Sequence, residues 1–273
     1  MTGWAALHWR GARWFGGTGP SGERHPVALS IGDRGRRRPI PGIRFWREAI
    51  TEPEVDVLRG VRVASPETAV FDEMRTQTRH SVRHAVTVLE MAMFAELTSR
   101  ARFRKYLATR RRRKWVDLAR TAVKLAHEGP ESPQESRMVL VWELDAGLPR
   151  PMCNADVFGE DGTWLGRPDL LDPSAGVVGE YDGGHHRSAK VRSHDVSREQ
   201  RFRSHGLEYF TIVEGDLPRR GRVVDRMVGT RQRALRSAEA QQWTLIPPPG
   251  SRPALSLDRR LELRELLADS TGG

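Results

Sequence analysis

The stretch GVVGEYDGGHH, residues 176–186, constrains the fold of this chain more than any other part of its sequence. Its valines and Tyr181 are typical of a buried strand, and the two glycines after Asp182 allow the backbone to turn sharply where that strand ends. Side chains two residues apart on a strand point to the same face, so we expect Glu180 and Asp182 to project together. An apolar strand with two carboxylates on one face needs a positive partner for them, because an unpaired buried charge is costly.

A second acidic stretch, RPDLLD at residues 167–172, precedes this strand by only a turn. If the two pair as a hairpin, Asp169 reaches the same face as Glu180 and Asp182. Three carboxylates in a half-buried sheet favour a divalent cation such as Mg²⁺, which prefers oxygen ligands. Simpler interpretations stay open for two acidic residues: Asp172 caps a turn, and Asp182 caps the turn at the glycines.

The pattern of residues 131–240 predicts a mixed sheet flanked by helices, an α/β (α+β) fold. We read the elements from hydrophobic periodicity and from glycines and prolines at their ends. The expected elements are a helix at 133–146 closed by Gly147, strands at 152–158, 162–165, 169–171 and 176–182, a helix at 187–205, a strand at 208–213 and a helix at 219–239.

Residues 1–130 predict a smaller module of helices and strands. Ser65, followed by a proline, begins a helix there as its N-cap. The arginine- and proline-rich stretch 34–42 is expected to be a turn or hairpin loop between two strands. Turn-forming residues at 127–134 separate this module from the sheet, and 241–273 reads as a Pro-rich linker with a final helix at 256–267. Within the module we expect a helix at 3–15, strands at 25–32, 43–47 and 60–64, and helices at 81–97, 100–109 and 115–127.

The charge of the chain is strongly basic, with 45 Lys and Arg against 35 Asp and Glu and a net charge of +10. Such a chain attracts polyanions such as DNA at long range. Only four of the 45 basic residues are Lys, which a GC-rich coding sequence would also produce. The densest basic cluster is interpreted either as a solvated helix junction or as a phosphate-binding patch, and it consists of Arg110, Arg111, Arg112, Arg113 and Lys114.

Cysteine content and hydropathy exclude several classes of protein. Cys153 is the one cysteine, so the chain forms no internal disulfide and no Cys-based zinc site. We find no apolar run that would span a membrane and no signal-peptide pattern at the start. We therefore expect a cytoplasmic protein with no membrane partner.

Five motifs in order, SPQESR, GLPRP, GRPDLLD, GEYDGGHH and DVSREQRFRSHGLEYFTI, resemble bacterial proteins allied to very-short-patch-repair endonucleases, in the PD-(D/E)xK superfamily. The resemblance covers about residues 131–236. It implies a restriction-endonuclease-like fold. The earlier stretches GWAALHWRG and RVASPETAVFDEM are similar to AbiEi-type antitoxin-like proteins. Those proteins usually begin with a winged helix-turn-helix. This chain begins after that position, so we expect no sequence-specific DNA reading by that route.

The resemblance also implies roles for individual residues. Asp169 matches the metal-binding Asp and Glu180 the Glu of the (D/E)xK motif, while Glu135 matches a helix Glu that completes the metal shell through water. His186 matches a downstream His that could act as general base, although a surface His beside a turn is the simpler interpretation. Arg198 matches a recurring Arg that could stabilise the transition state, with helix ion pairs as the alternative. Asp182 stands where the superfamily usually has Lys, which puts hydrolysis in question.

These observations predict a Mg²⁺-dependent DNA endonuclease. The alternative is a regulatory or antitoxin-like protein that uses a nuclease fold to hold nucleic acid or a protein partner such as a toxin. In a third interpretation the chain has a structural role and its basic charge reflects genome composition.

Overall fold

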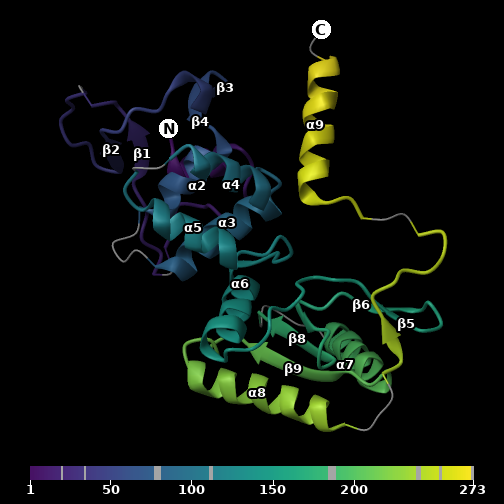
Figure 1. The fold of residues 1–273 in the computed structure, drawn as a ribbon. Helices are drawn as coiled ribbons and strands as arrows, with labels where there is room; N and C mark the ends of the chain where they lie inside the picture. Colours follow the sequence, from purple (N-terminus) through teal and green to yellow (C-terminus); the bar gives the residue numbers. More distant parts are fainter. Residues whose placement is uncertain are drawn as a thin grey trace. The chain divides into compact units, whose positions relative to one another are not determined.

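The computed structural model describes residues 1–19, 21–33, 35–76, 81–110, 113–183, 189–237, 241–251 and 254–271, and the side chains of 189–196, 269 and 271 are not among the described atoms. The chain forms two compact units. The first comprises Met1–Glu128 together with Leu255–Gly273, and the second comprises Gly129–Ala254. Both helices and strands occur in each unit (Figure 1), as expected for an α+β protein. Within the described residues, no helix has the length and apolar character needed to cross a membrane.

The first unit packs its helices against two small two-stranded sheets. Ser65 caps α2 by accepting a hydrogen bond from the Thr68 amide, which confirms the helix start expected there. The elements of this unit are α1 (Gly3–Trp9), β1 (Val27–Ser30), β2 (Ile43–Trp46), η1 (Glu52–Glu54), β3 (Val55–Leu58), β4 (Val61–Ala64), α2 (Pro66–Met74), α3 (Val82–Phe94), α4 (Arg100–Ala108), α5 (Val116–Leu125) and α9 (Leu257–Thr271).

Two strand pairings in the first unit differ from the expectation. Of the two expectations for residues 34–42, a turn or a hairpin loop, the hairpin is wrong, because β1 and β2 run parallel. The strand near residue 60 pairs with β3, an antiparallel partner that the sequence pattern did not indicate. Both differences arise because tertiary packing determines which strands pair. The alternation of apolar and polar residues within one strand does not indicate its partner.

The final helix, α9, packs on the first unit through two leucines and several ion pairs. Leu257 and Leu261 are buried. Asp258 accepts a hydrogen bond from Ser99 at 2.5 Å, and Arg260 pairs with Glu96 at 2.8 Å. The expected terminal helix is therefore present, and it is an integral part of the first unit.

The second unit is built on a mixed sheet in the order β7-β8-β9. The hairpin between β7 and β8 is antiparallel, which confirms the pairing expected from the sequence, and β8 and β9 are parallel. The helix expected at 133–146 is also confirmed, with its last turn widened to a π-helix. The elements are α6 (Pro133–Leu140), η2 (Val141–Asp145), β5 (Val157–Gly159), β6 (Trp164–Gly166), β7 (Leu170–Asp172), β8 (Val177–Asp182), α7 (Ala189–Ser204), β9 (Glu208–Val213), α8 (Arg220–Arg236) and β10 (Trp243–Thr244).

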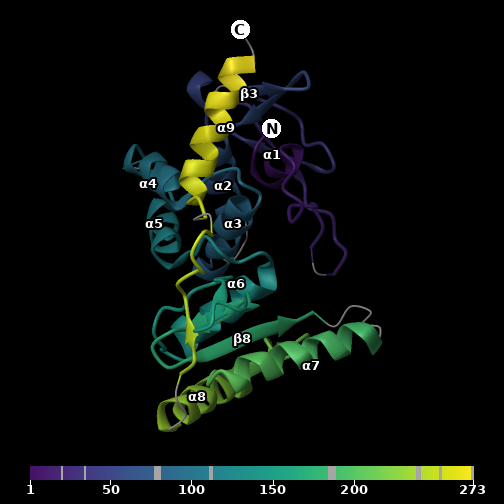
Figure 2. The same cartoon turned by 90° about the vertical axis from the view of Figure 1, so that its right-hand side faces the viewer.

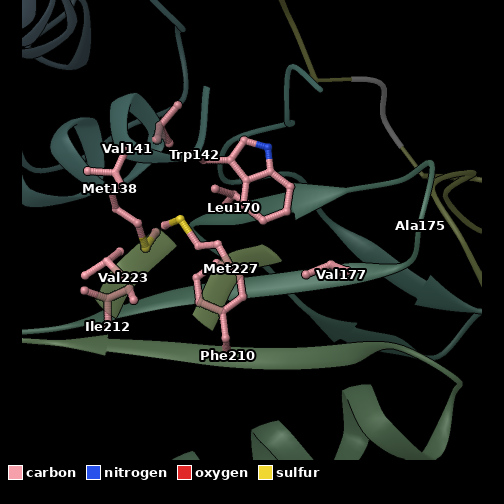
Figure 3. Close-up of a cluster of buried hydrophobic side chains, with 11 residues drawn as sticks. Met138, Val141, Trp142, Leu170, Ala175, Val177, Phe210, Ile212, Val223 and Met227 are labelled. Atoms are coloured by element: carbon pink, nitrogen blue, oxygen red, sulfur yellow. The ribbon is translucent and has the colours of Figure 1, made fainter. Parts of the chain in front are cut away.

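Two separate apolar clusters cover the two faces of this sheet. On one face α6, η2 and α8 pack against it, and the ring of Trp142 stacks on that of Phe210 with centroids 6.0 Å apart (Figure 3). On the other face Phe202 of α7 packs with residues of β5 and β6. Figure 2 shows α7 and β8 from a second side. The strands β5 and β6 join β10, from the expected linker, in a small sheet of their own.

Candidate carboxylate site

The alternation of side chains along β7 and β8 places the predicted acidic residues on one face of the sheet. Leu170 and Val177 belong to the cluster under α6 and α8, whereas Leu171 and Val178 belong to the cluster under α7. Side chains two apart share a face, so Asp169, Glu180 and Asp182 lie on the face covered by α7. This is the arrangement that the hairpin predicted.

Asp169 stands one residue before β7, opposite Glu180 if the register of the hairpin continues. Its Oδ2 accepts a hydrogen bond of 2.7 Å from the amide of Tyr181. Burial raises the pKa of Asp169 to about 7, and the negative charge of Glu135 adds to this effect. The Tyr181 hydrogen bond and the charge of Arg198 lower the same pKa, but they do not offset the loss of water.

Glu135 combines two roles at the start of α6. The amide of Glu135 donates to Ser132 Oγ at 3.2 Å, so Ser132 is the N-cap of the helix. The Glu135 carboxylate in turn accepts from the amide of Glu131 at 2.8 Å, in a variant of the capping box. The same carboxylate raises the pKa of Asp169, which places the Glu135 side chain, at the N-terminus of α6, beside the hairpin.

Asn154 links the start of α6 to the residues before β7, although the sequence pattern predicted a strand at this position. Its Nδ2 donates to Glu135 Oε2 at 2.9 Å and to the carbonyl of Gly129 at 3.0 Å. Its amide donates to the carbonyl of Pro168, directly before Asp169. The backbone of Asn154 is left-handed, with φ of 50°, which asparagine tolerates better than most residues. The expected strand therefore begins only at Val157.

Arg198 supplies the positive charge at this site. Its Nη2 lies 2.9 Å from Oε1 of Glu180, and the side chains of Arg198 and Glu180 are 27% and 14% exposed. The same guanidinium donates to the carbonyl of Arg167. The pKa of the nearby Tyr209 is raised by burial and then by the charge of Glu180. The carboxylate of Glu180 is thus partly neutralised by an arginine from α7.

Asp182 and Asp172 have different positions. Asp182 ends β8, about 7 Å along the strand from Glu180. Asp172 is buried and accepts from the Ser174 amide at 3.0 Å and from Arg231 Nε at 2.8 Å, which confirms that it caps the turn. Across the described ranges, no group of three or more His, Cys, Asp and Glu side chains is arranged to hold a metal ion. Sharing a face does not by itself close the distance between Asp182 and the other two carboxylates.

The predicted basic cluster lies in the first unit. Arg110 pairs with Glu54 and stacks over the ring of Tyr106, with 4.5 Å between guanidinium and ring centre. Arg113 lies 3.4 Å from Glu48. Arg110 and Arg113 are therefore engaged within the first unit. Lys114 lies over the ring of Trp115. Three predicted residues fall outside the described residues, namely Arg111, Arg112 and His186.

The chemistry of this donor set fits a hard divalent cation in part. Asp169 offers a buried carboxyl group whose raised pKa a nearby cation would lower, and the carboxylate of Glu135 adds oxygen atoms close to it. Glu180 would complete the set if Arg198 released it.

Comparison of the chain with protein-family models, with curated proteins and with solved structures finds no match.

Proposed function

We propose that the second unit is a divalent-metal-dependent phosphodiesterase that acts on DNA, with Asp169 and Glu180 as oxygen ligands of the ion and Glu135 reaching it through water. The observation that carries this proposal is the carboxyl of Asp169, whose pKa is raised to about 7 beside Glu135. A fold gains little stability from a carboxyl group that is held away from water beside a second carboxylate, so Asp169 is a sign of function. A bound Mg²⁺ would polarise a phosphoryl oxygen and lower the pKa of a water molecule.

The residues of the chain then have distinct tasks. The Tyr181 amide holds Asp169 in place, and Asn154 holds Glu135. Arg198, released from Glu180 by the ion, would offset negative charge that develops on the phosphate. Phosphodiester cleavage of this kind depends on positioning and on charge, both of which the hairpin and α7 supply.

A non-catalytic nucleic-acid-binding or antitoxin-like role is the second candidate. The ion pair between Arg198 and Glu180 favours it, because the carboxylate already has a cation in contact. Asp182, in the place of the superfamily's Lys, also favours it. In this case metal ions would change neither DNA binding nor stability, and Glu180→Gln would leave DNA binding intact.

Cleavage of supercoiled plasmid by the full chain, with Mg²⁺, Mn²⁺ or Ca²⁺, tests the proposal. Asp169→Asn and Glu180→Gln are expected to reduce the rate by roughly a hundredfold or more, the scale on which removal of a single catalytic electrostatic group acts. The matched controls are Asp145→Asn and Glu160→Gln, because both residues are exposed and belong to the same unit. The proposal fails if the intact chain cleaves no plasmid with any of the metals, or if Asp169→Asn cleaves as fast as the unaltered chain.

A further inference from the structure

Helix α8 and the residue before it carry a row of arginines at alternating three- and four-residue spacing. Between residues 219 and 236 the sequence has seven Arg and one Asp. Positions three or four apart lie on one side of a helix, so these arginines form a continuous row, interrupted once by Gly229. We call this set the arginine row, and it consists of Arg219, Arg222, Arg226, Arg233 and Arg236.

Two members of the arginine row, Arg226 and Arg233, contact residues of β9, which is an edge strand of the sheet. The neighbouring side of α8, about 100° around the helix, packs on the sheet through Val223 and Met227. Arg226 Nη1 donates to the carbonyl of Thr211 at 2.6 Å, and Arg233 Nε lies 3.3 Å from Glu208. These contacts with β9 fix the direction of the row without covering it, since the side chains of Arg226 and Arg233 are 40% and 59% exposed.

Two members of the row, Arg222 and Arg236, remain available to a partner. Arg222 and Arg236 are exposed, and neither forms an ion pair with any residue in the part of the chain that the structure describes. If the arginines reflected genome composition alone, they would be scattered along the helix. They would not recur every three or four residues on one exposed flank. The row is about 25 Å long, with steps of roughly 4.5 to 6 Å between neighbouring arginines.

We propose that the arginine row binds the sugar-phosphate backbone of duplex DNA. Each strand of a duplex carries phosphates at regular intervals of about 3.4 Å along the helix axis, so 25 Å spans roughly seven of them. The guanidinium group forms forked hydrogen bonds to phosphate, which suits arginine better than lysine. The exposed neighbours Asp225 and Gln232 are polar, so this flank lacks the apolar side chains with which a helix enters a membrane surface.

This proposal goes beyond the carboxylate site and does not depend on hydrolysis. The arginine row lies on α8, which packs on the face of the sheet opposite to Glu180 and Arg198. Binding can therefore be measured in EDTA, where no metal-dependent cleavage takes place. Loss of the DNA-binding proposal would appear as unchanged affinity of the variants in EDTA. Loss of the nuclease proposal would appear as absence of plasmid cleavage with metal ions.

The test measures fluorescence anisotropy of a labelled 20-base-pair duplex with the full chain at several KCl concentrations. Arg222→Gln and Arg236→Gln are each expected to weaken binding roughly three- to tenfold at 0.1 M salt and to lower the salt slope by about 0.9. Arg220→Gln is the matched control, because Arg220 is exposed on another side of α8 and the net charge changes equally. The proposal is overturned if Arg220→Gln weakens binding as much as Arg222→Gln does, or if the chain binds anionic vesicles but not the duplex.

Gly229 offers a gain-of-function test. A Cβ added there would contact only the end of the flexible Arg233 side chain, at 3.8 Å, so the backbone at this position has room for a side chain. Gly229→Arg is expected to tighten binding and to raise the salt slope by about 0.9. Gly229→Ala provides the same gain in helix propensity without the charge. Equal affinities for these two variants would contradict the proposal.

Discussion

Glu180 of β8 and Arg198 of α7 form an ion pair of 2.9 Å on the face of the sheet that also carries Asp169. The pair connects the hairpin to the helix that covers it. Because the positive charge of Arg198 also lowers the pKa of Asp169, the arginine stabilises two carboxylates at once. The titration of Asp169 is therefore the most direct readout of this site.

Arg198→Gln is expected to raise the pKa of Asp169 above about 7, since the charge that opposes protonation is removed. Carbon-13 NMR of the Asp carboxyl groups across pH 4–9 measures this change. Arg201→Gln on the same helix is the control, because Arg201 is not one of the groups that mainly determine the pKa of Asp169. An unchanged pKa in Arg198→Gln would show that Arg198 is not close to Asp169 in solution.

The stability of the chain should respond to the pKa of Asp169. In the folded chain Asp169 keeps its proton up to about pH 7, whereas in the unfolded chain it loses it near pH 4. The folded state then binds more protons between these values, so the free energy of unfolding falls as pH rises from about 4 to 7 and levels off above. Asp169→Asn is expected to flatten part of this fall, measured by urea denaturation at pH 5, 6, 7 and 8. A profile identical to that of the unaltered chain would contradict the enclosed carboxyl.

Glu73 gives a second, independent part of the same pH dependence, in the first unit. Its carboxylate is enclosed and accepts from the amide of Trp4 at 2.8 Å, and burial raises its pKa to about 7. The sign is the same as for Asp169, so the stability contributed by protonated Glu73 is lost as pH rises through 7. Glu73→Gln keeps an acceptor for Trp4 and is expected to stabilise the chain at pH 8 by up to about 3 kcal/mol. Glu23→Gln, at an exposed position, should change nothing.

Mg²⁺ should reverse the pH effect of Asp169 if the nuclease proposal holds. A cation bound by Asp169 needs that carboxylate deprotonated, so its stabilising effect should grow between pH 5.5 and 8, as the pH passes the pKa of about 7. Thermal unfolding with 5 to 10 mM Mg²⁺ measures this growth. The unaltered chain should gain stability, and Asp169→Asn should gain none. An equal response of both proteins would assign the effect to general salt binding.

A glycine at position 154 can adopt the left-handed backbone conformation of Asn154, but it cannot form the side-chain hydrogen bonds. Asn154→Gly accommodates φ of 50° and loses the bonds to Gly129 and Glu135, whereas Asn154→Ala loses the bonds and also strains the backbone. We expect both variants to be destabilised, with alanine about 1 kcal/mol worse. Urea denaturation compares the two. Equal stabilities would show that the left-handed conformation is not kept.

The elements that the sequence predicts well are those in which signal and partner lie close together. The hairpin of β7 and β8 is one example, because two short apolar runs are joined by a turn that Asp172 caps. Ser65 is another, because a cap needs only its own next residues. The shared face of Asp169 and Glu180 follows from the period of two along a strand.

The features that the sequence did not predict depend on contacts between distant segments. The parallel partner of β1, the return of β10 to β5 and the attachment of α9 to the first unit are all of this kind. The candidate site shows the same limit. Nothing in the local pattern indicates that Arg198 would turn to Glu180, or that Asn154 would hold Glu135 through a left-handed backbone.

The position of α9 has a consequence for any dissection of this protein. Because Leu257–Thr271 completes the unit that Met1 begins, residues 129–254 are an insertion with both ends anchored in the same body. A fragment that stops at residue 128 would expose the surface that Leu257 and Leu261 cover, and so it would be an incomplete folding unit. A protease cut between residues 245 and 254 would leave two polypeptides still joined through that helix, and they should co-elute until a denaturant separates them.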